Sequence, residues 1–207
     1  MSSVGAVRPL RSVLFARGDN RESLDKAVSS GADSIVADLE EPRTPYTEPD
    51  RERGRGVARE FFDSQPAVAQ RGSAPLLFSR VQPWSTGQTL KDLRAVMGPS
   101  LGGILVPKIQ SPADVHAIDA LLTCMEVEFD LERGSVVIYP ILETAAAIRL
   151  AYEIGTASPR VAYMGGAISR FGDIHQAIGF RWTSEGEETL WFAVTEYQNV
   201  PWLRTCK

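Results

Sequence analysis

From Arg11 onward the chain alternates short apolar runs with longer amphipathic segments. The apolar runs are rich in β-branched and aromatic residues, which is typical of strands buried on both faces of a parallel sheet. The amphipathic segments between them favour helices, so the pattern predicts a repeating strand–helix unit. Six strands are predicted, over residues 11–17, 32–40, 74–82, 102–109, 135–143 and 160–166.

Capping residues mark the ends of the predicted helices. In the first helix Asp19 can act as the N-cap, and Gly31 closes the helix. Ser111 and Pro112 suit the N-cap and the first position of the fourth helix. The segment RERGRGVAR, residues 51–59, is interpreted as a solvated basic helix face. The helices are expected over residues 18–31, 50–62, 89–97, 112–126 and 144–155.

Strict alternation of strands and helices implies parallel strands joined by right-handed crossovers. An open doubly wound sheet and a (β/α)₈ barrel both fit this order, although the barrel needs eight units and typically about 250 residues. The first strand–helix junction, FARGDNRES, is neither a GxGxxG nor a Walker sequence. The nucleotide-binding version of the open sheet is therefore disfavoured.

Composition is that of an ordinary globular protein, with 207 residues, of which 43% are apolar and 23% charged. We expect one domain over residues 1–207. The net charge of −4 argues against nucleic acid or an anionic membrane as the main partner. No segment approaches the ~20 apolar residues of a membrane span. Cys124 and Cys206 lack metal or redox spacing, and the N-terminus lacks a secretory core, so a cytoplasmic location is expected.

Charged side chains recur where the predicted strands end. Parallel strands point one way, so these side chains should converge on one rim, where α/β folds place their chemistry. Glu143 is conspicuous, because it stands where the apolar run VVIYPIL meets a helix-forming run and a buried carboxylate is costly unless paired or bound to a metal. The residues concerned are Arg17, Asp38, Glu40, Glu41, Arg80, Lys108, Glu143 and, past the sixth strand, Asp173.

Several carboxylates with few histidines indicate a hard divalent cation such as Mg²⁺ rather than zinc. Arg80 suits a planar substrate carboxylate, and a metal with an arginine beside a carbonyl can stabilise an enolate. Other interpretations stay open. Glu143 could be a carboxylate favoured by the helix dipole, and Asp173 an N-cap. Arg80 could form an ion pair with Asp38 or Glu40, and Lys108 could be a structural cation.

Five stretches, in order, resemble the citrate lyase β-subunit-like enzymes of the HpcH/HpaI aldolase superfamily. They are RSVLFARGDNRESLDKAVSSGADSIVADLEE, SRVQ, LVPKIQSPADV, ILETAAAI and GDIHQAIG. The resemblance implies a Mg²⁺-dependent TIM barrel that makes or breaks carbon–carbon bonds in malyl-, citramalyl- or citryl-CoA thioesters and related hydroxy acids.

The resemblance also assigns roles to residues of the rim. Glu143 and Asp173 would be the metal ligands. Arg80 and Glu143 would be catalytic, and Arg80 would bind the substrate carboxylate or carbonyl. The further substrate-binding residues would be Arg17, Asp38, Glu40 and Lys108.

Three departures from the family pattern bear on these expectations. Arg17 stands where the family usually has proline, and Ala177 where many members have a second aspartate. The chain ends after about six of eight strand–helix units, so we expect a C-terminally truncated barrel. Its atypical aromatic tail, residues 187–207, could serve an oligomer contact, and a homo-oligomer is expected.

The resemblance leaves two other functions open. One is a hydroxy-oxo-acid aldolase that forms a pyruvate enolate. The other is a catalytically inactive paralogue that retains only a metal site.

Overall fold

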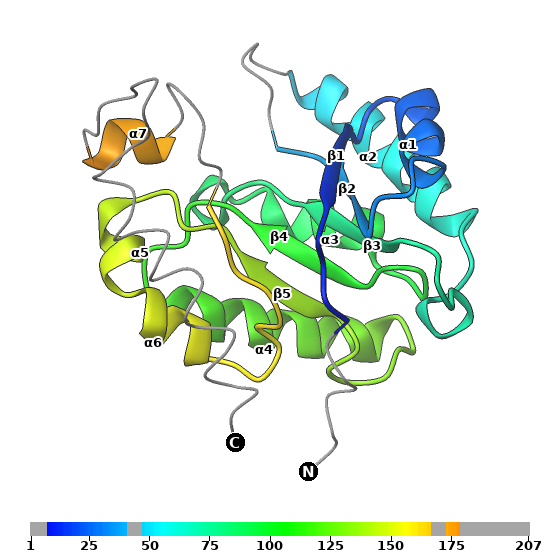
Figure 1. The fold of residues 1–207 in the computed structure, drawn as a ribbon. Coiled ribbons are helices and arrows are strands. Elements are labelled where there is room, and N and C mark those ends of the chain that lie inside the picture. The colour runs from blue at the N-terminus through cyan, green and yellow to red at the C-terminus, as the bar shows by residue number, and fades with distance from the viewer. Residues whose placement is uncertain (1–7, 41–46, 167–172, 179–207) are drawn as a thin grey trace.

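The computed structural model describes residues 8–40, 47–166 and 173–178, in which parallel strands alternate with helices (Figure 1). The strands are β1 (Val13–Arg17), β2 (Ser34–Asp38), β3 (Leu76–Arg80), β4 (Gly103–Val106) and β5 (Val137–Pro140). The helices are α1 (Arg21–Val28), α2 (Glu48–Asp63), α3 (Thr89–Val96), α4 (Pro112–Glu128), α5 (Ala145–Arg149), α6 (Ala151–Thr156) and α7 (Asp173–Ile178). Two 3₁₀ turns, η1 (Val68–Gln70) and η2 (Trp84–Thr86), flank β3.

The sheet decides between the two predicted architectures. Its strands are all parallel and lie in the order β1-β2-β3-β4-β5. In a doubly wound sheet, strands are added on both sides of the first strand, so the strand order is not sequential. In a barrel each strand is added beside the previous one. The predicted TIM-barrel type of α/β fold is therefore confirmed. The part of the chain that the structure describes forms an open arc of the barrel.

The predicted sixth strand, residues 160–166, is present only as two isolated parallel bridges, Ile138–Val161 and Ile141–Gly165. The segment therefore follows β5 in barrel order without a continuous ladder. Gly165 lies against the ring of Tyr139, where an added Cβ would be 3.0 Å from the tyrosine oxygen. A side chain at that position would require the end of the Tyr139 ring to shift by a few tenths of an ångström.

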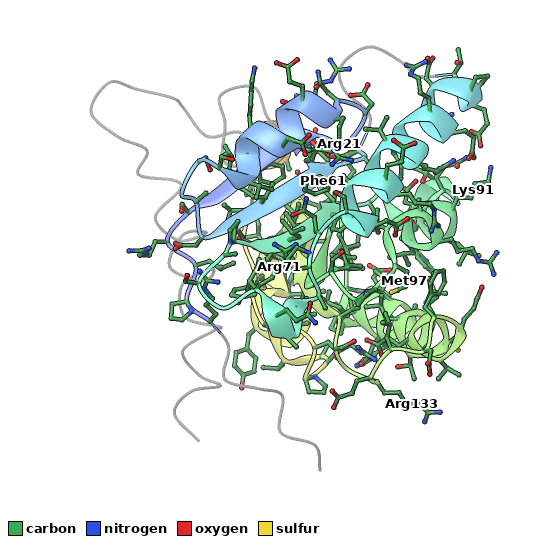
Figure 2. The ribbon with its side chains drawn as sticks, turned by 90° about the vertical axis from the view of Figure 1, so that its right-hand side faces the viewer. Arg21, Phe61, Arg71, Lys91, Met97 and Arg133 are labelled. Carbon is green, nitrogen blue, oxygen red and sulfur yellow. The ribbon has the colours of Figure 1, made fainter. Side chains whose placement is uncertain are left out.

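The two faces of the sheet carry different clusters, because successive side chains of a strand point to opposite faces. Ile35, Leu77 and Ile104 belong to the larger cluster, packed against the helices on the outer side (Figure 1). Val36, Phe78, Leu105 and Ile141 form the inner cluster, where the Phe78 and Tyr163 rings meet edge-on at 5.8 Å. Figure 2 shows Arg21 beside Phe61, where α1 meets α2, with the guanidinium 5.8 Å from the ring centroid.

Helix starts follow the expected chemistry with one correction. Ser111 caps α4 in a capping box with Asp114, and Pro112 is its first residue, as predicted. The N-cap of α1 is Asn20 rather than Asp19, because the Asn20 side chain accepts from the Ser23 amide. Asp19 instead receives two hydrogen bonds from Arg17.

Element lengths also differ from the prediction. Each strand has four or five residues, shorter than its apolar run. The helix predicted over residues 144–155 is divided into α5 and α6 at Leu150, which serves as C-cap of one and N-cap of the other. None of the described helices is both long and apolar enough to cross a membrane.

A buried ion network lies at the amino end of β5. The Arg160 guanidinium donates to both oxygens of Glu126, at 2.7 Å each, and to Asp119 at 2.6 Å. Glu126 also accepts from the amides of Gly134 and Val136. Burial alone would raise the pKa of Glu126, but the hydrogen bonds from Arg160 and these amides lower it. The sequence pattern did not predict this network.

Candidate active site

The register of the first three strands brings their terminal charged residues side by side. Arg17 pairs with Asp38 across β1 and β2, and Asp38 pairs with Arg80 across β2 and β3. Their side chains therefore leave the same face of the sheet at its carboxyl end. The convergence of Arg17, Asp38 and Arg80 follows from this parallel register.

Arg80 is held by two carboxylates. It donates to both oxygens of Asp38, at 2.8 and 2.6 Å, and its Nη1 lies 2.5 Å from Glu40 Oε2. Its guanidinium also lies over the Phe15 ring, 5.2 Å from the centroid. The ion pair considered for Arg80 is therefore present, and its planar fork binds Asp38 through two hydrogen bonds.

Glu40 is an unusual member of this group. Burial raises the pKa of Glu40 to about 7, with Arg80 opposing the shift and the nearby charges of Glu143 and Asp38 adding to it. Asp38 and Glu40 share the guanidinium of Arg80, so the negative charge of Glu40 is poorly compensated. Glu40 can therefore exchange a proton near neutral pH.

Glu143 lies at the carboxyl end of β5, as predicted, and is only 6% exposed. Its carboxylate accepts the Lys108 amide at 3.2 Å. Burial raises the pKa of Glu143, the Lys108 amide opposes this, and the charge of Asp173 raises it further. Glu143 and Asp173 are thus close enough to repel each other.

Asp173 is the first residue of α7, which lies beside α5 (Figure 1). Its carboxylate is 3.4 Å from Lys108 Nζ, and both side chains are about half exposed, at 51% and 46%. Lys108 therefore contacts both carboxylates that were expected to bind a metal, Glu143 through its backbone and Asp173 through its side chain.

A pocket beside the Arg80 group was only partly predicted. Arg17, Asp38 and Arg80 line it from the strand ends, and Arg55 and Asp92 line it from α2 and α3. Arg55 is 4% exposed and donates to Asp92 at 2.8 Å, so the interpretation of residues 51–59 as a solvated face is wrong for Arg55.

Arg55 is buried where α2 packs against α3. Its guanidinium donates to Asp92 and, at 2.8 Å, to the side-chain oxygen of Gln88. These partners lie more than 30 residues away in the sequence, so a helix pattern over residues 51–59 cannot show them.

The rim carries an excess of negative charge that suits a cation. Four carboxylates, Asp38, Glu40, Glu143 and Asp173, interact there with two cations, Arg80 and Lys108. No cluster of three or more histidine, cysteine, aspartate or glutamate side chains suited to a metal occurs within residues 8–40, 47–166 and 173–178. Two carboxylates completed by water and substrate oxygens are nevertheless sufficient for Mg²⁺.

Two parts of the sequence-based picture lie outside the described residues. They are Glu41 and the aromatic tail over residues 187–207.

The sequence is similar to known lyases over most of its length. The chain is 27% identical over 151 residues to the citrate lyase subunit beta of Leuconostoc mesenteroides subsp. cremoris, covering 73% of this chain and 47% of the relative. It is 30% identical over 165 residues to an L-malyl-CoA/beta-methylmalyl-CoA lyase of Cereibacter sphaeroides, covering 76% of this chain and 48% of the relative. The chain thus spans about half the length of these curated relatives.

A solved structure shares the fold. CitE from Mycobacterium tuberculosis, in complex with magnesium and acetoacetate, superposes with a TM-score of 0.66 at 20% identity, covering 98% of this chain and 72% of that one. The family described as HpcH/HpaI aldolase/citrate lyase matches residues 11–199. With its parallel barrel order and its charged rim, this chain belongs to the HpcH/HpaI aldolase/citrate lyase family.

Proposed function

We propose that the protein is a Mg²⁺-dependent carbon–carbon lyase that cleaves a small hydroxy acid carried as a CoA thioester, such as malyl-, citramalyl- or citryl-CoA. The observation that carries the proposal is the surplus of carboxylates around Lys108 and Arg80 at the strand ends. Relatives named citrate lyase subunit beta and malyl-CoA lyase support the substrate class, and the magnesium in CitE supports the metal.

Glu143 and Asp173 would hold the metal. Their mutual repulsion, and the burial that raises the pKa of Glu143, both favour a bound cation. When bound, Mg²⁺ supplies a Lewis acid that polarises a substrate oxygen. The one or two protein carboxylates leave room for substrate oxygens in its octahedron.

Arg80 would hold the carboxylate or carbonyl of the substrate. Cleavage breaks the carbon–carbon bond and turns the hydroxyl-bearing carbon into a carbonyl as the hydroxyl proton passes to a general base. The electron pair of the broken bond stays on the thioester fragment as an enolate, which then takes up a proton at carbon to give the acyl-CoA product. A fixed guanidinium stabilises this developing charge. Glu40 and Asp38 orient Arg80, and the rise in the pKa of Glu40 lets it lose its charge when an anionic substrate approaches Arg80.

Arg17 and Lys108 would assist in substrate binding. Arg17 lines the pocket beside Arg80, although its guanidinium is paired with Asp19. Lys108 contacts both proposed metal ligands, so its charge would face a substrate bound to the metal.

The test is direct. The purified chain is incubated with Mg²⁺ and, separately, with malyl-, citramalyl- and citryl-CoA and with a free hydroxy-oxo acid, and the products are separated by liquid chromatography. We expect cleavage of a thioester that EDTA abolishes. Glu143→Gln should weaken Mg²⁺ binding at least about tenfold with little change in unfolding temperature, because rim residues contribute little to the core.

Glu128→Gln is the matched control, since Glu128 is exposed at the end of α4 and pairs only loosely with Arg94, at 3.6 Å. Pyruvate formed from the free acid alone would favour the aldolase alternative. Mg²⁺ binding without turnover of any substrate would favour the inactive paralogue. A chain that neither binds Mg²⁺ nor turns over any of the substrates would contradict the proposal.

We also propose that the chain self-associates. Leu14 and Phe15 on β1 are 38% and 44% exposed, and among the described strands β1 pairs with β2 alone. An exposed apolar strand edge favours association. Sedimentation velocity at micromolar concentration should show species larger than a monomer, and a single sharp monomer would contradict this expectation.

A further inference from the structure

Lys108 has a backbone conformation that lysine rarely adopts. Among the described residues, two that are not glycine have positive φ: Lys108, at 55°, and Asp130, at 54°. Asp130 immediately follows the C-cap of α4, where a left-handed residue commonly ends a helix and where aspartate is tolerated. Lys108 follows a strand instead, two residues beyond β4. Its conformation therefore needs a different explanation.

The consequence of this conformation lies at Glu143. The Lys108 amide donates to Glu143 Oε2 at 3.2 Å, across the junction of neighbouring strands β4 and β5. Sparsely populated backbone conformations persist where the surrounding structure requires them, and they gather at functional sites. The turn at Lys108 directs a fixed donor at a carboxylate that is only 6% exposed.

The side chain of Lys108 reaches the other carboxylate. Its Nζ is 3.4 Å from Asp173 Oδ2, and the pair is about half exposed. A lysine ammonium is a compact charge on a flexible stem, so it can leave its partner without moving the backbone. Exposed pairs of this kind contribute little to stability, so little free energy opposes their separation.

We infer that Lys108 is the positioning residue of the proposed metal site. Its backbone amide holds Glu143 whether or not a cation is bound, and its ammonium group is an internal counter-ion on Asp173 that a divalent cation displaces. The inference rests on the proposed function, because it assumes that Glu143 and Asp173 bind the metal. It predicts that the lysine charge lowers the affinity of the site for Mg²⁺.

Mg²⁺ affinity, measured by isothermal titration calorimetry on the full chain without substrate, tests this. Lys108→Met keeps the side-chain length and removes the charge, and it should bind Mg²⁺ roughly two- to fivefold more tightly. Lys108→Gly also removes the charge and adopts positive φ without strain, so it should show tighter binding even if the methionine variant folds poorly. A merely structural lysine would give weaker binding on replacement, not tighter.

Lys91→Met is the control. Lys91 lies on α3 and pairs with Glu48 at 2.5 Å, and Figure 2 shows it at the outer side of the molecule. Its replacement removes the same charge and a comparable exposed pair, and Mg²⁺ affinity should stay within experimental error of the wild type. An equal increase in Lys91→Met would show a general charge effect and overturn the inference.

Failure of the inference can be told apart from failure of the proposed function. If the wild type binds Mg²⁺ and Glu143→Gln weakens that binding, the metal site stands. Unchanged or weaker binding in both Lys108 variants then overturns the inference alone. If the wild type binds no Mg²⁺, both the metal site and the inference are overturned.

Discussion

Two arginines, each with two carboxylate partners, stand at opposite ends of the strands. At the amino end Arg160 contacts Glu126 and Asp119, and Glu126 also accepts two backbone amides. At the carboxyl end Arg80 contacts Asp38 and Glu40. The pKa of Glu126 is lowered, because hydrogen bonds outweigh its burial, whereas burial raises the pKa of Glu40 to about 7.

The difference shows how one fold separates stability from chemistry. Backbone amides complete the solvation of Glu126, so its charge is stable in the core. Glu40 is buried, shares its guanidinium with Asp38 and faces the further charge of Glu143, so the attraction of Arg80 does not fully compensate its charge. A carboxylate whose charge is incompletely compensated can change its protonation when a ligand binds. Barrels of this type commonly concentrate catalysis at the carboxyl end and stability at the amino end.

The largest expected effect comes from breaking the amino-end network. Arg160→Met should lower the free energy of unfolding by about 3–5 kcal/mol, because it leaves the fully buried carboxylate of Glu126 without its positively charged partner. Urea denaturation measures this. Arg94→Met, which removes the 3.6 Å surface pair with Glu128, is the control and should change stability little. An equally small loss for Arg160→Met would contradict the structural role of the network.

At the carboxyl end the matching change should reduce catalysis more than stability. Arg80→Lys keeps the charge but loses the bidentate fork toward Asp38, and kcat/KM for the thioester should fall by about 100-fold. Its urea midpoint should move less than that of Arg160→Met, because Asp38 and Glu40 are partly exposed. Mg²⁺ affinity should be retained. Full activity in Arg80→Lys would remove Arg80 from the proposed mechanism.

The pH dependence of stability separates the two carboxylates by sign. Folded Glu40 keeps its proton up to about pH 7, whereas an unfolded glutamate loses it near 4.5, so Glu40 makes the free energy of unfolding fall as pH rises between these values. Glu126, with a lowered pKa, makes stability fall as pH drops below about 4.5. Urea denaturation of wild type and Glu40→Gln across pH 4.5–7.5 should show a flatter profile for the variant, by on the order of 1–2 kcal/mol.

Glu143 contributes to the same profile with the same sign, because its pKa is also raised, and it remains in the Glu40→Gln variant. Some slope should therefore persist. Identical profiles for the variant and the wild type would show that Glu40 ionises normally.

The smallest effect is expected at Asp33, also at the amino end. Asp33 accepts from the Arg11 side chain and from the backbone amides of Arg11 and Ser12, and the Arg11 side chain holds the pKa of Asp33 well below its usual range. Arg11→Met removes an exposed guanidinium but leaves the two amides. The thermal midpoint should therefore be indistinguishable from that of the wild type. A clearly lower midpoint would mean that the two amides do not suffice to stabilise the carboxylate of Asp33.

Some features of the site could be predicted from sequence because they depend on local pattern and on the geometry of parallel strands. Asp38 and Arg80 end neighbouring apolar runs, so their convergence followed once the strands were known to be parallel. The prediction of Asp19 as the N-cap of α1 was wrong because Asp19 and Asn20 are both good caps. The hydrogen bonds from Arg17 to Asp19 cannot be seen in a helix pattern. The burial of Arg55 likewise depends on residues distant in the sequence, because its guanidinium is held by Asp92 and Gln88 of the α3 region.

The sequence by itself determined the alternation of strands and helices, the N-cap of α4 and the set of charged residues at the strand ends, because these depend on residues within a few positions of one another. The tertiary structure alone decided the sequential strand order, the amino-end network of Arg160, the left-handed turn at Lys108 and the raised pKa values of Glu40 and Glu143. Burial and charge compensation depend on atoms brought together from distant parts of the chain, so they exist only in the folded protein.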